Sequence, residues 1–136
     1  MLTTMDAAQA LADLTEISSQ VVNVVIATAD GEVLATTIDD EGRAGRFTNL
    51  LLELVNESDE ARRERGLETM TQLEAATLDG SIFVVRRGGV LVGATTRPDP
   101  TVGLVFYDLK HCLRAVAEPD PAPAVSRRRK AADATA

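Results

Sequence analysis

The chain has 136 residues and a mass of 14.5 kDa, which is enough for one domain with a short tail. With 45% hydrophobic and 26% charged residues it has the composition of a folded protein, and its net charge of −7 disfavours contact with nucleic-acid backbones or anionic membranes. Only 3% of the residues are aromatic, so few rings are available to stack on bases. The single cysteine, Cys112, excludes an internal disulfide and a cysteine-rich zinc site.

The chain begins with a helical pattern. Apolar residues recur at three- and four-residue spacing from Met5 to Ile17, which predicts a helix with one buried face. Thr3 and Asp6 resemble a capping box in which Asp6 takes the place usually held by glutamate.

Two strands are predicted next, over Val21–Thr28 and Glu32–Ile38, because both segments are rich in β-branched residues. Asp30 and Gly31 lie between them. An Asp-Gly pair at this place favours a tight hairpin, since glycine readily adopts the positive φ angle that the turn needs.

A long helix is predicted from about Gly45 to Arg65, after the acidic residues 39–41 and before a stop at Gly66. Its apolar side chains spread over roughly 200° of a helical wheel, whereas packing on one sheet needs about 100°. The side chains in this arc are those of Phe47, Leu50, Leu51, Leu52, Leu54 and Val55. The excess lies chiefly at Leu52 and Val55 and favours contact with a second subunit. Coverage by a loop or the tail, or tolerated exposure, is the alternative.

Three further strands are predicted over Gln72–Leu78, Ser81–Arg87 and Val90–Thr96, with Asp-Gly and Gly-Gly pairs between them. The first of these carries small and polar side chains, contains no proline and begins the meander. We therefore expect it at a sheet edge, where it can pair with the same strand of a second copy.

The last helix is expected after Pro98-Asp99-Pro100, with Asp99 as its cap and Pro100 in its first turn. An apolar stripe then continues to Val116. From residue 119 the composition changes to proline, alanine and the basic cluster SRRRK, which predicts a flexible tail. We thus expect a domain over residues 1–118 and a tail over 119–136. The domain has 10 basic and 19 acidic residues and a net charge of −9, and the tail has 4 and 2 and a net charge of +2.

No motif for catalysis, cofactor binding or metal binding is predicted. The P-loop motif is absent, and the glycines at 88, 89 and 93 indicate a hairpin turn and a small strand residue. His111 and Cys112 are helix neighbours that point about 100° apart, so they do not form a nucleophile pair, and Cys112 falls on the apolar stripe. The acidic residues 39–41 lack the alternating spacing of a calcium loop.

The element order is α-β-β-α-β-β-β-α, which predicts an α+β protein with a five-stranded antiparallel sheet covered by helices. Over about residues 4–118 this order resembles that of the Roadblock/dynein light chain family. The resemblance implies a sandwich fold of the Roadblock-like or profilin-like kind. The resemblance rests on the long second helix, on VVNVVIATADGEVLATTI and on VLVGATTRPDPTVGLVFYDLKHCLRAV.

The resemblance implies a non-enzymatic homodimer in which the second helix and the third strand form the seam. Bacterial relatives regulate small Ras-like GTPases, some by stimulating GTP hydrolysis, and others are encoded beside a sensor-kinase-like protein. We expect this chain to be such a regulator or scaffold. The alternative is a small-molecule-sensing or purely structural dimerisation module, for which Asn23 is the notable buried polar residue. The interface residues implied are Leu51, Leu52, Val55, Gln72, Leu73, Glu74, Ala75, Ala76, Thr77 and Leu78.

Three arginines near the end of the long helix, Arg62, Arg63 and Arg65, offer a cationic finger for a GTPase. Pairing with acids 57, 59 and 60 along the same helix is the favoured interpretation. We expect no nucleic-acid partner. The basic cluster SRRRK is the one segment that could contact acidic lipid, but a role of its charges in solubility is the favoured interpretation. The first ten residues lack the pattern of a secretory signal, which favours a cytoplasmic protein.

Overall fold

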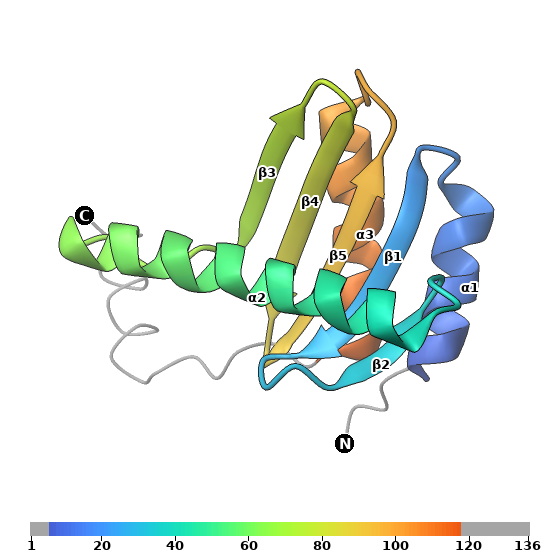
Figure 1. The fold of residues 1–136 in the computed structure, drawn as a ribbon, viewed down its shortest axis with the longest axis horizontal. Helices are drawn as coiled ribbons and strands as arrows, with labels where there is room; N and C mark the ends of the chain where they lie inside the picture. Colours follow the sequence, from blue (N-terminus) through green and yellow to red (C-terminus); the bar gives the residue numbers. More distant parts are fainter. Residues whose placement is uncertain (1–5, 118–136) are drawn as a thin grey trace, which may run out of the picture.

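The computed structural model describes residues 6–117, which form three helices and five strands in the predicted order (Figure 1). The predicted tail over 119–136 lies outside the described residues. The helices are α1 (Ala7–Ile17), α2 (Glu41–Glu64) and α3 (Val102–Val116). The strands are β1 (Val21–Thr28), β2 (Val33–Thr36), β3 (Gln72–Thr77), β4 (Gly80–Arg87) and β5 (Val90–Thr96).

The strands form one antiparallel sheet in the order β2-β1-β5-β4-β3, so the α+β class and the edge position of β3 are confirmed. The hairpins β1–β2, β3–β4 and β4–β5 join strands that are close in the sequence. β1 pairs with β5 across the middle and brings the two halves of the chain together. The other edge is the short strand β2.

Alternate side chains of each strand point to opposite faces of the sheet, and each face has its own core. α1 and α3 cover one face, where the rings of Phe83 and Phe106 meet edge to face with centroids 5.0 Å apart. α2 covers the other face (Figure 1). Cys112 is buried between α1 and α3, as predicted for a core thiol, and burial raises its pKa to about 11.

The first two helices, α1 and α2, each have an aspartate as their N-cap residue. The Asp6 carboxylate accepts a hydrogen bond of 2.7 Å from the backbone N–H of Ala8, so Asp6 is the N-cap of α1. The capping-box prediction was wrong on this point, since it placed Asp6 inside the helix. α2 begins at Glu41, four residues before the predicted start at Gly45, because Asp40 caps it. The N–H of Arg43, which donates to the Asp40 carboxylate, lowers the pKa of Asp40.

The predicted end of α2 is confirmed, whereas the predicted start of α3 is wrong. Gly66 has a φ of 71° and donates to the Arg63 carbonyl, and the next N–H donates to the Arg62 carbonyl, which is a Schellman end. At α3 the N-cap is Thr101, two residues after the predicted cap. Asp99 instead adopts a φ of 58°, a turn conformation in which it does not cap the helix.

Gly93 sits in the middle strand directly below α2. A Cβ atom at this position would overlap Cδ1 of Leu51 and lie 2.8 Å from its Cδ2. The Leu51 side chain is fully buried, so it has no free space to move into. The predicted small residue in β5 therefore sets how closely α2 approaches the sheet.

We expect Gly93→Ala to lower the free energy of unfolding by about 1–3 kcal/mol, because Leu51 must leave its rotamer or push α2 away. Chemical denaturation monitored by circular dichroism measures this. Gly103→Ala is the matched control, because a Cβ there meets no atom within 4 Å, and it should be neutral or slightly stabilising. Equal stability of the two variants would contradict the packing described here.

Candidate functional site

α2 covers only part of the sheet face on which it lies. Its buried residues Thr48, Leu51 and Val55 rest on the middle of the sheet, along the row that contains Val84 and Gly93. Its C-terminal half continues past β3, the edge strand (Figure 1). The neighbouring row of sheet residues stays only half-buried. In order across the sheet this row is Ala75, Ile82, Thr95 and Asn23.

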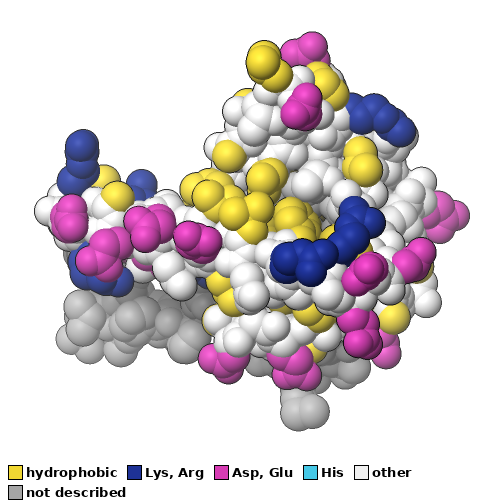
Figure 2. Space-filling model, in the orientation of Figure 1, with side chains coloured by type: hydrophobic (Ala, Val, Ile, Leu, Met, Phe, Trp, Pro, Cys, Tyr) yellow, Lys and Arg dark blue, Asp and Glu magenta, His cyan; other side chains and the backbone are white. Residues whose placement is uncertain are grey.

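Apolar side chains of α2 border this uncovered row. Phe47 lines a hollow with Asn23 and Ile38, which places its side of the helix toward the row. Leu50 and Leu54 lie three and seven residues further on, at helical spacing for the same side, and Leu50 is 40% exposed. Figure 2 shows hydrophobic side chains gathered between α2 and the strands. We call these three side chains and the row Ala75, Ile82, Thr95 and Asn23 the open groove.

The predicted excess of apolar surface exists, but on other residues than predicted. Leu51 is fully buried and Val55 is 3% exposed, both within the core of this one chain. Leu52 is half-buried beside Gly31 in the β1–β2 turn. Leu51 and Val55 are therefore covered by their own chain, Leu52 is covered only in part, and the more exposed apolar surface is on the Leu50 side of the helix.

The edge strand β3 leaves backbone groups without a strand partner in the described part of the chain. Within residues 6–117 its one neighbouring strand is β4, and the N–H of Arg86 donates to the Thr71 carbonyl, which fixes the hydrogen-bonding phase of the ladder. In that phase the backbone N–H and C=O of Gln72, Glu74 and Ala76 point away from β4. Leu78, predicted as strand, lies in the β3–β4 turn and is 97% exposed.

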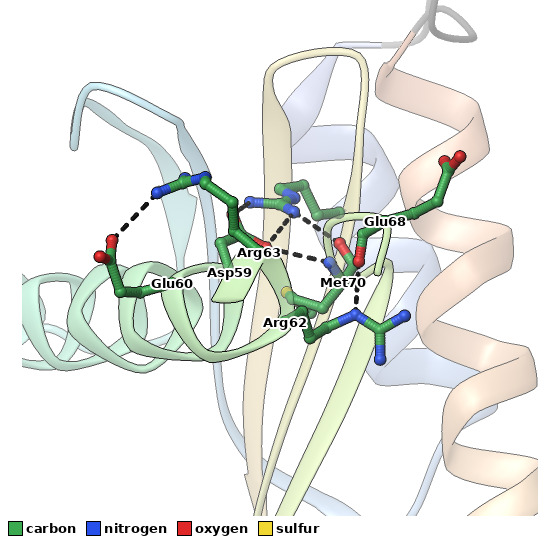
Figure 3. A network of polar contacts seen from close by, with 7 residues as sticks. Asp59, Glu60, Arg62, Arg63, Glu68 and Met70 are labelled. Atoms are coloured by element: carbon green, nitrogen blue, oxygen red, sulfur yellow. Dashed lines mark hydrogen bonds and ion pairs between the residues drawn. The ribbon is translucent and has the colours of Figure 1, made fainter. Parts of the chain in front are cut away.

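A polar network attaches the C-terminal half of α2 to the sheet (Figure 3). Asp59 forms two contacts with the guanidinium of Arg86, of 2.7 and 2.9 Å, and both side chains are largely buried, at 13% and 21% exposed. Arg86 also donates to the Met70 carbonyl, and the Met70 N–H donates to Asp59. The Arg86 guanidinium lowers the pKa of the Asp59 carboxyl, and the Met70 N–H adds to this effect.

This network corrects the predicted pairing of the helix arginines. Arg63 pairs with Glu60 at 3.0 Å along the exposed side of the helix, as expected. Asp59 pairs instead with Arg86 of β4. Arg62 donates to the backbone carbonyl of Glu68, which ties the residues after α2 back to the helix (Figure 3). The sequence gives no local signal for the Asp59–Arg86 pair, because 27 positions separate the two residues.

The polar residue proposed for ligand sensing, Asn23, is half-buried and already has a partner. Its Nδ2 donates to the Thr95 Oγ1 at 3.2 Å within the uncovered row. Within residues 6–117, no cluster of three His, Cys, Asp or Glu side chains is placed to hold a metal ion. Over the same residues, no helix combines the length and the apolar character needed to cross a membrane.

No protein-family model and no curated protein sequence matches the chain. Solved structures do. A Roadblock/LC7 domain from Streptomyces avermitilis superposes with a TM-score of 0.71 at 16% identity, over 82% of this chain and 93% of that one. MglB from Myxococcus xanthus gives 0.70 at 11% identity, over 92% and 95%. A third structure, described as MglB with a tetrameric arrangement, gives 0.71 at 14% identity, over 82% and 85%.

This chain has the Roadblock/LC7 fold. The resemblance seen in the sequence is thereby confirmed at the level of the three-dimensional arrangement. The open groove and the β3 edge are thus the candidate interaction surfaces of this chain.

We expect Asp59→Asn to lower the free energy of unfolding by about 2 kcal/mol near neutral pH, because Arg86 is left largely buried without its carboxylate. The pKa of Asp59 is lowered on folding from 3.8, so its ionised form contributes stability above that value. The difference between wild type and variant should shrink as the pH falls below about 4.

Urea unfolding of both proteins across this pH range measures the effect. Glu60→Gln removes a pair whose two side chains are 62% and 67% exposed, so it should cost less than about 0.5 kcal/mol at any pH. If Asp59→Asn and Glu60→Gln behave alike, the network does not attach α2 to the sheet.

Proposed function

We propose that this chain is a non-catalytic homodimeric regulator or scaffold of a small Ras-like GTPase in a bacterial signalling system. The observation that carries the proposal is the position of the open groove directly beside the unpaired β3 edge. The Roadblock/LC7 fold supports it, since regulation of such GTPases is what the resemblance implies. In this proposal residues 1–118 form the dimerising domain in the cytoplasm, and a sensor-kinase-like protein is a further partner.

A second copy fits the two features together. A two-fold axis beside β3 would pair Gln72–Thr77 with the same strand of the partner and extend the sheet. The half of α2 that passes beyond β3 (Figure 1) would then lie over the sheet of the second copy, next to the open groove of that copy. Leu50 and Leu54 of both copies would lose their contact with water there. The charged residues near Glu60 would form the polar rim of that contact.

A dimer of this kind would give the GTPase a binding surface and would not supply side chains that take part in GTP hydrolysis. Hydrolysis of GTP needs an oriented water and stabilised charge on the transferred phosphoryl group. Arg62 and Arg63 are engaged by Glu68 and Glu60, which disfavours a finger role for them. Any stimulation would therefore come from positioning the switch segments of the GTPase itself.

We expect the wild-type chain to sediment at twice its 14.5 kDa mass at micromolar concentration, and Leu50→Glu to sediment as a monomer. The charge replaces a side chain that is already 40% exposed, so the fold should survive while the groove becomes unable to take an apolar partner. Leu104→Glu is the matched control, at a leucine of α3 that is 51% exposed, and it should remain dimeric.

Glu74→Pro tests the edge strand separately, because it removes a backbone donor that points away from β4. Glu74→Ala keeps that donor and should leave the dimer intact. A wild-type chain that stays monomeric at micromolar concentration, with Leu50→Glu unchanged from it, would refute the dimer.

The GTPase role is tested with a purified small Ras-like GTPase from the same genome, loaded either with GDP or with a non-hydrolysable GTP analogue. We expect binding to one loaded form to be at least about tenfold tighter, because the switch segments differ between the two states. Single-turnover GTP hydrolysis with wild type and with a variant carrying alanine at positions 62, 63 and 65 should give the same rate. A large loss in that variant would indicate a finger.

Failure to bind any such GTPase in either state would refute this role and leave the dimerisation module. A ligand-dependent rise in melting temperature, with no GTPase binding, would favour the small-molecule-sensing alternative.

A further inference from the structure

A hollow of about 320 Å³ lies between β4 and α3, on the sheet face opposite α2. Its lining includes Arg86 and Arg87 from β4 and Lys110 and Arg114 from α3. The Arg86 guanidinium is bound by Asp59 on the opposite face of the sheet, so the charge at the hollow comes from Arg87, Lys110 and Arg114. The remaining lining comes from Thr71 and the buried side chains of Val85 and Leu113. None of these residues is acidic, so the hollow is a concentrated positive region.

This concentration is unusual for the chain that carries it. The whole chain has a net charge of −7, and residues 1–118 contain only 10 basic residues, of which three, Arg87, Lys110 and Arg114, supply the charge at this hollow. Arg86 is neutralised by Asp59. Among the described residues, Arg87, Lys110 and Arg114 form no ion pair. The ammonium of Lys110 instead lies 5.9 Å from the ring centroid of Phe106.

Arg87 provides a second observation, independent of the charge. Its Nε is buried and has no hydrogen-bond partner in the described part of the chain. A buried donor without an acceptor destabilises the fold, so such groups are rare and call for an explanation. Lys110 and Arg114 lie one helical turn apart and reach the same hollow from α3. Arg114 lies in the last turn of α3, where a positive charge interacts favourably with the helix dipole. This interaction explains the presence of Arg114 but not that of Arg87 or Lys110.

We propose that this hollow binds the phosphate group of a soluble phosphorylated small molecule. A guanidinium and two further cations match the charge and the acceptor geometry of a phosphate better than those of a neutral ligand. The volume suits a small molecule. The acidic charge of the rest of the chain disfavours a membrane as the source of the phosphate. The site lies on the far side of the sheet from the open groove, so it is independent of the proposed dimer.

The probe is inorganic pyrophosphate, titrated calorimetrically into the full-length chain at low and at physiological salt. We expect saturable binding with one site per chain. Lys110→Gln/Arg114→Gln should weaken it at least about tenfold, since two charge-assisted contacts are lost. The matched control is Arg65→Gln/Arg97→Gln, which removes the same charge from two exposed arginines and should change the affinity less than about twofold.

Arg87→Lys tests the guanidinium itself, because it keeps the charge and removes the Nε donor. We expect a loss of at least about tenfold in affinity, with a melting temperature of the free protein that is unchanged or raised, because an unsatisfied buried donor is removed. If Arg87→Lys fails to fold, the double glutamine variant decides, because it changes only side chains at the surface of α3.

Three outcomes would overturn the proposal. The first is no saturable pyrophosphate binding, and the second is an equal loss in the Arg65→Gln/Arg97→Gln control, which would indicate general charge attraction. The third is binding of phosphatidylcholine vesicles that contain a phosphoinositide, lost in Lys110→Gln/Arg114→Gln, without any binding of pyrophosphate. That result would place the phosphate in a lipid headgroup.

Discussion

The close approach of Leu51 to Gly93 determines how α2 lies on the sheet and therefore which surfaces remain open. Five strands spaced by about 4.8 Å span roughly 20 Å, whereas a helix of 24 residues is about 36 Å long. A helix seated across the middle row therefore passes beyond the sheet edge and leaves a neighbouring row uncovered. The open groove and the projecting half of α2 are two results of the same geometry. Both lie beside β3, the edge strand.

The Asp59–Arg86 pair makes this arrangement stable, because the projecting half of α2 has little sheet beneath it. Strand alternation places Arg86 and Arg87 on opposite faces of β4. Arg86 meets the carboxylate of Asp59, and it is neutralised there. Arg87 meets only Lys110 and Arg114 among the charged side chains of its hollow. The two adjacent arginines thus have different environments. Arg86 is held in an ion pair that supports the fold, whereas Arg87 is available to bind an anion.

The order of the elements and the edge position of β3 could be predicted from the sequence, because they depend on local patterns such as the Asp-Gly turns. The orientation of α2 could not. Its buried face is centred near Thr48, whose hydroxyl donates to the Ala44 carbonyl and is thereby satisfied without leaving the helix. A helical wheel that scores Thr48 as polar moves the predicted buried face toward Leu50 and Leu54. The predicted excess therefore falls at Leu52 and Val55, on the other side. The Asp59–Arg86 pair and the basic hollow depend on strands that meet only in three dimensions.

The two candidate surfaces depend on different physical forces. The open groove is apolar and joins an unpaired strand edge, so its association with a second copy rests on burial and backbone hydrogen bonds, which salt weakens little. The hollow around Arg87 rests on charge, and salt screens it directly because its lining cations are partly open to water. The β-sheet lies between them, with Phe83 and Val85 buried on one face and Val84 on the other. A change of ionic strength therefore separates the two interactions within one intact molecule.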